Sequence, residues 1–153
     1  MASPFPLPLP MRRALELARD AAESGEVQIG AVVTLAGRIV GEGQNRNRRD
    51  NDPTAHAEIV AIRAAAAVAG DFRLTGHALW VTLEPCALCA AALAHARLDA
   101  VYYGASDPKS GGVEHGARVF THPQCHHRPD IFPGVGEGEA ALLLRDFFAQ
   151  RRS

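Results

Sequence analysis

The segment Pro85-Cys86-Ala87-Leu88-Cys89, which follows the apolar run Ala78–Leu83, constrains the fold of this 153-residue chain most. We expect a strand over 78–83 and a helix from Cys86 to about Ala96. Both thiols then lie in the first helical turn and share a face, because residues three apart do so. Free N–H groups and the helix dipole favour thiolates there. The segment therefore predicts a strand, a tight turn and a helix whose N-terminus can bind a metal.

A second short motif, His56-Ala57-Glu58, opens another expected helix, which runs from Ala55 to about Ala69 and is capped by Thr54. One imidazole and two thiolates leave a fourth position open, which is typical of catalytic zinc sites. We therefore expect one Zn²⁺ per subunit, bound by His56, Cys86 and Cys89, with water or hydroxide as the fourth ligand. Helical positions two apart point about 200° away from each other. Glu58 is thus predicted to move protons at that water and not to bind the metal.

The order of strands and helices defines the fold class. The other expected elements are a helix from Pro10 to Gly25, a hairpin of strands 27–35 and 38–43, a loop over 44–53, a strand over 100–103, a loop over 106–112 and a helix over 137–152, with 116–127 unassigned. Alternating strands and helices predict an α/β three-layer α-β-α sandwich around a mixed, about five-stranded sheet. Residues 10–153 are expected to form one domain, and the Pro-rich residues 1–9 a flexible arm.

Composition excludes several classes of protein. The net charge of −1 argues against capture of nucleic acid by the charge of the whole protein. Three cysteines are not a disulfide framework and indicate a reducing compartment. We expect a cytoplasmic protein without a membrane segment, because no apolar run reaches about 18 residues. Cys125 is interpreted as a spare thiol; a second metal site is the alternative, because three histidines surround it: His122, His126 and His127.

Four segments outside the two short motifs carry a family resemblance, and they are Asn51–Glu58, Thr82–Cys86, Tyr103–Lys109 and Leu144–Phe148. With them, the chain resembles the bacterial tRNA-specific adenosine deaminases over roughly residues 11 to 150. The resemblance implies the cytidine-deaminase-like fold and hydrolysis of adenosine to inosine at the wobble position of a tRNA anticodon, with release of ammonia. It also implies a homodimer, for which the Ala-rich stretch Cys89–Ala96 offers a close-packing surface.

The resemblance also implies contacts to the RNA. Asn45 would hydrogen-bond the target nucleotide, Asp107 and its loop would contact flanking nucleotides, and Phe148 would shape the wall that receives the RNA. Each residue also has a purely structural alternative. Asn45 and Asp107 could instead stabilise turns, and Phe148 could instead pack in the core. Phosphate contacts are expected from four cations, with solvated surface as the alternative: Arg46, Arg48, Arg49 and Lys109. Gln28, where the family usually has proline, and residues 112–118 depart from the family pattern.

Two other functions compete with this interpretation. Guanine deaminases share the His-Ala-Glu and Pro-Cys-x-x-Cys motifs, so deamination of a free purine base or nucleoside is the first alternative. The Gly104–Lys109 loop and the Asp146–Phe148 ending favour the tRNA class. The second alternative is a zinc-stabilised RNA-binding module without catalysis. In such a module Glu58 would have no structural role, which favours an enzyme.

Overall fold

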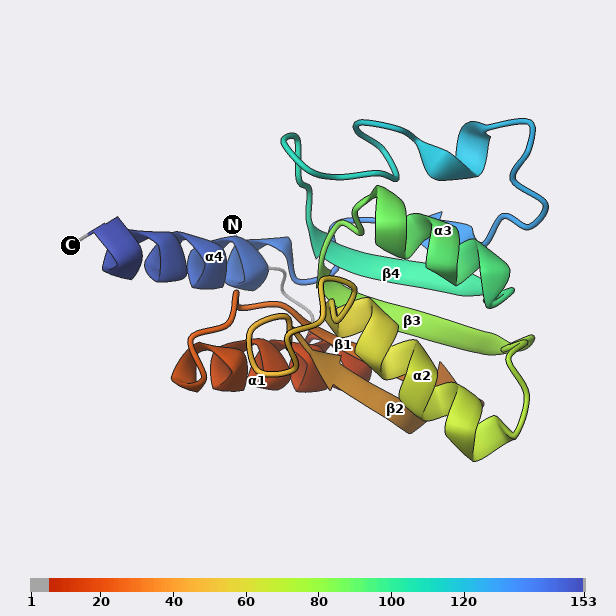
Figure 1. Ribbon diagram of the computed structural model, residues 1–153, viewed down its shortest axis with the longest axis horizontal. Helices are drawn as coiled ribbons and strands as arrows, with labels where there is room; N and C mark the ends of the chain where they lie inside the picture. Colours follow the sequence, from red (N-terminus) through yellow and green to blue (C-terminus); the bar gives the residue numbers. More distant parts are fainter. Residues whose placement is uncertain (1–5, 153) are drawn as a thin grey trace.

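The computed structural model describes residues 6–152, apart from the side chains at positions 148 and 150–152. Its centre is a mixed five-stranded sheet in the order β2-β1-β3-β4-β5 (Figure 1). The strands are β1 (Gly30–Leu35), β2 (Arg38–Gln44), β3 (His77–Leu83), β4 (Ala100–Ala105) and β5 (Asp130–Phe132). β1 pairs antiparallel with both β2 and β3, whereas β3, β4 and β5 run parallel.

Four α-helices cover the two faces of the sheet: α1 (Leu9–Glu23), α2 (Ala57–Ala69), α3 (Ala87–His95) and α4 (Glu137–Arg152). α2 and α3 pack on one face, over a core that includes Val33, Leu79 and Tyr103. α1 and α4 pack on the other face, where Met11, Ala105 and Ala140 are buried together. This confirms the predicted three-layer α-β-α sandwich. No helix in residues 6–152 is long and apolar enough to cross a membrane.

Close contact between α2 and the hairpin fixes the position of the α2 N-terminus. Gly41 and Gly43 of β2 lie directly beneath the helix, and a Cβ on Gly43 would come within 2.2 Å of the Ala57 carbonyl oxygen. Three alanines of α2 are fully buried in this contact: Ala57, Ala61 and Ala65. Small residues on both surfaces therefore allow the backbones to approach closely.

The observed elements differ from the expected ones in several places, and β5 lies where no strand was expected. β1 begins at Gly30 and not at Val27, because Ile29 N–H donates to the Val27 carbonyl in a turn. α1 begins at Leu9, inside the expected arm, and Leu7 packs against the α1–α4 core. The unassigned stretch contains one 3₁₀ turn, η1 (Val119–Thr121).

Candidate active site

The site forms where the N-termini of α2 and α3 meet at one end of the sheet. His56 is the N-cap residue of α2 and Cys86 is the N-cap residue of α3, both with extended backbones. β3 leads into α3 through the Glu84-Pro85 turn, and β2 leads into α2 through a loop over 45–55. Because the two helices start beside each other, residues 30 positions apart in sequence meet.

Three ligand atoms converge at these helix starts. His56 Nδ1 lies 3.5 Å from Cys86 Sγ and 3.4 Å from Cys89 Sγ. Tetrahedral zinc with ordinary bond lengths separates a nitrogen and a sulfur ligand by about 3.6 Å. Within residues 6–152, this is the one group of three His, Cys, Asp or Glu side chains whose ligand atoms lie within 4.8 Å of one another. The residues therefore fit a three-ligand zinc site.

The ligand atoms also change one another's protonation. A hydrogen bond with Cys89, supported by the His56 ring, lowers the pKa of the Cys86 thiol to about 4 against the effect of burial. The same Cys86–Cys89 bond and burial raise the pKa of Cys89. The Cys86 sulfur in turn raises the pKa of His56 through their hydrogen bond. A thiolate is thus already favoured at Cys86 at neutral pH, which suits the binding of a cation.

Glu58 lies in the first turn of α2, outside the group formed by His56, Cys86 and Cys89. Its side chain is buried, and burial raises its pKa to about 7. A carboxyl group with a pKa near the working pH can both accept and return a proton. The position and environment of Glu58 therefore suit a proton carrier.

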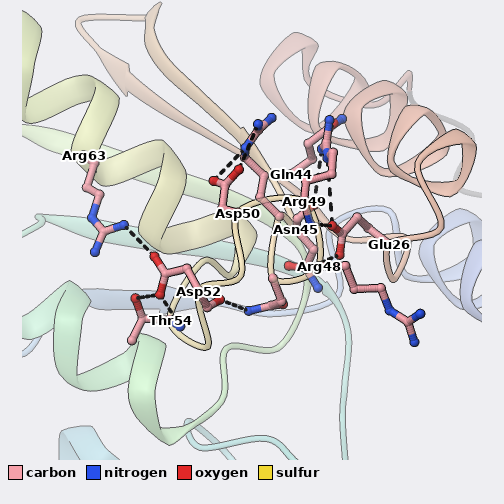
Figure 2. Close-up of polar contacts among 11 residues, drawn as sticks. Glu26, Gln44, Asn45, Arg48, Arg49, Asp50, Asp52, Thr54 and Arg63 are labelled. Carbon is pink, nitrogen blue, oxygen red and sulfur yellow. Dashed lines mark hydrogen bonds and ion pairs between the residues drawn. The ribbon is translucent and has the colours of Figure 1, made fainter.

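Asn45, directly after β2, holds the start of α2. Its Oδ1 accepts a 2.8 Å hydrogen bond from the backbone N–H of Ala57. The prediction that Thr54 caps this helix is wrong, because Thr54 N–H and Oγ1 both bond to Asp52 Oδ1 (Figure 2). Among the described residues, no protein group accepts a hydrogen bond from Asn45 Nδ2. That amide group therefore remains available to a ligand.

The three arginines of the 45–55 loop differ in their partners (Figure 2). Arg46 pairs with Asp50 at 3.0 Å, and the Arg49 side chain bonds to Gln44 and lies 3.9 Å from the Glu26 carboxylate. Arg48 is exposed, and its side chain has no partner in residues 6–152. Of the three, Arg48 is therefore the cation most available to a phosphate.

The other predicted contact residues lie in two further places. Asp107 Oδ1 accepts bonds from the N–H groups of Lys109 and Ser110, so it stabilises a turn, and the Lys109 side chain is exposed. The predicted role of Phe148 concerns a side chain outside the described part of the chain.

The alternative metal site around Cys125 is not assembled in the part of the chain that the structure describes. His122 Nε2 lies 2.7 Å from the Ala117 carbonyl oxygen, and His127 Nε2 lies 2.6 Å from that of Leu98. The Cys125 thiol donates to the His127 carbonyl. These side chains therefore serve the local backbone.

Sequence reasoning did not single out two buried carboxylates beside the site. Glu26 accepts hydrogen bonds from the backbone N–H groups of Arg48 and Arg49, and Glu84 accepts several from the loop after β4. Burial alone would raise the pKa of Glu84, but the N–H of Asp107 and the ring and N–H of His115 keep it below its usual value. The local signal in the sequence was that each of these acidic residues borders an apolar segment.

Comparisons with known proteins agree with this geometry. Residues 9–105 match the model of the cytidine and deoxycytidylate deaminase zinc-binding region. The chain is 53% identical over 142 residues to the tRNA-specific adenosine deaminase of Agrobacterium fabrum, covering 93% of each protein. A structure from a study of A-to-I editing by tRNA:A34 deaminases at the wobble position superposes with a TM-score of 0.87 at 52% identity. That match covers 88% of this chain and 98% of the other.

A guanine deaminase is a more distant relative. The Bacillus subtilis enzyme is 32% identical, with a TM-score of 0.64 over 94% of this chain and 92% of that one. The tRNA-specific enzymes are thus nearer than this guanine deaminase in both sequence and structure. The chain belongs to the cytidine and deoxycytidylate deaminase family and, within it, to the tRNA-specific adenosine deaminases.

Proposed function

We propose that this protein hydrolyses adenosine to inosine at the wobble position of a tRNA anticodon and releases ammonia. The observation that carries the proposal is the meeting of His56, Cys86 and Cys89 beside the buried Glu58. Relatives named for this reaction support the choice of substrate. The same substrate supports a cytoplasmic location, where tRNA is found.

The residues divide the chemistry between them. His56, Cys86 and Cys89 would hold one zinc ion per subunit, which when bound lowers the pKa of a water molecule and makes it a nucleophile. Glu58 accepts a proton from the water as the water oxygen bonds to C6 of the purine, and it passes that proton to N1 as the C6=N1 double bond opens. Glu58 then moves the proton of the new C6 hydroxyl to the exocyclic amine, and the bond from C6 to that amine breaks to leave inosine and ammonia.

The contacts of Asn45 limit what it can offer the nucleotide. Because its Oδ1 is occupied by Ala57 N–H, only the Nδ2 amide is available. We therefore assign to Asn45 a hydrogen bond donated to an acceptor on the target nucleotide. Arg48 and Lys109 are the cations that we assign to RNA phosphates, since both are exposed, whereas Arg46 and Arg49 interact with acidic residues.

A deamination assay on an anticodon stem-loop bearing wobble adenosine tests this function. We expect inosine and equimolar ammonia from the stem-loop, and no ammonia from free guanine. Glu58→Gln should retain zinc while losing at least about a hundredfold in turnover. Ammonia from guanine without inosine would support the free-base alternative. Loss of zinc in Glu58→Gln would identify Glu58 as a ligand, contrary to its proposed role.

We also propose a homodimer that forms through an apolar groove between α2 and α3. The groove has a volume of about 400 Å³, and its lining includes Ile59, Ile62 and Phe72. Phe72 is 69% exposed, although phenylalanine is among the residues most often buried. Light scattering should show a dimer at micromolar concentration, and Phe72→Asp should shift it to monomer. The control Val68→Asp alters an equally exposed residue of α2 outside the groove and should remain dimeric.

A further inference from the structure

Glu84 holds the loop that follows β4. Its side chain has no exposed surface and lies in the turn between β3 and the ligand Cys86. Five hydrogen bonds from the loop end on its two carboxylate oxygens, at 2.8 to 3.2 Å. They come from both ends of the loop: Asp107 N–H, the N–H groups of Val113, Glu114 and His115, and His115 Nδ1.

The loop, residues 106–116, is also packed tightly against this turn. A Cβ on Gly111 would lie 2.3 Å from Glu84 Oε2, and one on Gly112 would lie 2.5 Å from Ala87 N. Gly112 N–H also donates to the Pro85 carbonyl at 2.8 Å. The loop therefore lies directly on the backbone that presents Cys86, with no room for side chains between them.

Apart from Glu84, the loop is held by a turn around Asp107 and by single hydrogen bonds to neighbouring segments. Residues 106–116 contain no helix or strand and include three glycines. Glycine-rich segments lose much conformational freedom when they become ordered. A buried carboxylate must also be fully hydrogen-bonded, so Glu84 and the loop N–H groups depend on each other. A single carboxylate thus links the two ends of a segment without regular secondary structure.

The loop carries Lys109, an exposed cation that the proposed function assigns to an RNA phosphate. Lys109 follows the turn that Asp107 stabilises at the start of the loop. We propose that Glu84 is a positioning residue that keeps the 106–116 loop preformed for the nucleotides flanking the target adenosine. This inference rests on the proposed function. Glu84 acts through the loop and not on the reacting atoms, so its loss weakens RNA binding and leaves the chemical step intact.

Steady-state kinetics of Glu84→Gln on the stem-loop test this role. The amide keeps the size of the side chain but turns an NH₂ group towards backbone N–H donors. We expect KM for the stem-loop to rise at least about tenfold, as for loss of hydrogen bonds to a charged group. We expect kcat to change less than about threefold and zinc to remain bound, because the groups at the reacting atoms are unchanged.

Gly111→Ala provides a second variant that leaves Glu84 unaltered. Its new methyl group would press on Glu84 Oε2 and on the Asp107 carbonyl, at 2.3 and 2.5 Å, and displace the loop. It should reproduce the rise in KM with kcat retained. Glu42→Gln is the matched control, because Glu42 also accepts side-chain hydrogen bonds but lies on the exposed surface of β2. It should leave both constants unchanged.

Amide hydrogen exchange gives a readout independent of RNA. In Glu84→Gln, the Val113, Glu114 and His115 amides should exchange at least about tenfold faster, while those of β1 are unchanged. An unchanged KM in both variants would overturn the proposal, as would a fall in kcat at constant KM. Zinc loss in both variants would also overturn it and assign Glu84 to the metal site. A wild-type protein that forms no inosine would instead contradict the proposed function itself.

Discussion

Replacing Gly43 with alanine tests how the hairpin positions the catalytic helix. The new Cβ would lie 2.2 Å from the Ala57 carbonyl oxygen and 2.6 Å from the Ala61 nitrogen, both in the backbone of α2. Side-chain rotation cannot relieve contacts with backbone atoms. Reaching an ordinary contact of 3.4 Å requires the helix start to move about 1.2 Å relative to β2.

This displacement has two measurable consequences. Overpacking of this kind costs about 1–3 kcal/mol, which for a domain of this size lowers Tm by about 2–12 °C. His56 and Glu58 move with α2, whereas Cys86 and Cys89 belong to α3. Because a shift of about 1 Å in a catalytic group can cost a hundredfold in rate, we expect kcat/KM on the stem-loop to fall by about that factor.

Calorimetry, zinc titration and stem-loop kinetics measure these effects. The matched control is Gly138→Ala, the same chemical change in α4 at a position with no heavy atom within 4 Å. There, alanine should raise stability by about 0.5–1 kcal/mol, because it restricts the unfolded chain and suits a helix. A Gly43→Ala protein with wild-type Tm and kcat/KM would refute the argument that α2 is fixed by backbone contact with β2.

Three further predictions follow from the site. Cys86→Ala should lose zinc, measured by elemental analysis, and lower Tm, since metal binding is coupled to folding. Arg48→Ala should weaken stem-loop binding and reduce the slope of log Kd against log salt concentration by about one. Arg46→Ala should have a smaller effect, because the charge of Arg46 is already paired with Asp50. In protein freed of zinc by a chelator, burial raises the pKa of Glu58 to about 7 from 4.5, so the folded state holds a proton that the unfolded state has lost. The free energy of unfolding of the zinc-free protein should therefore fall as pH rises between about 4.5 and 7, by up to about 3 kcal/mol more than that of Glu58→Gln. Urea unfolding of both proteins at about pH 5 and about pH 8 measures this difference.

Elements with a clear local pattern were predictable from the sequence. The helices α2 and α3 and the strand β3 were expected within a few residues of their observed bounds, because periodicity and helix starts are local signals. β5 was not located, since it has only three residues, Asp130–Phe132, between two prolines. It exists through pairing with β4 and stacking of Phe132 on Tyr102, with ring centroids 4.7 Å apart.

Long-range hydrogen bonds decided the features that the sequence did not reveal. A capping residue is usually sought next to its helix, which favoured Thr54, whereas Asn45 acts from twelve positions away. Glu84 bonds to residues 23 to 31 positions later in the chain. An acidic residue beside an apolar segment is a local signal, but it does not show which distant loop will cover the carboxylate, because the loop itself supplies the burial.

This division between local and long-range signals also separates chemistry from specificity. The metal ligands belong to short motifs at two helix starts, and such motifs occur in adenosine and guanine deaminases alike. They therefore identify the reaction but not the substrate. Substrate choice must depend on what surrounds the site, and here that is two loops held by buried carboxylates, Glu26 for residues 45–55 and Glu84 for residues 106–116. Weakening either carboxylate should therefore alter RNA recognition before it alters deamination.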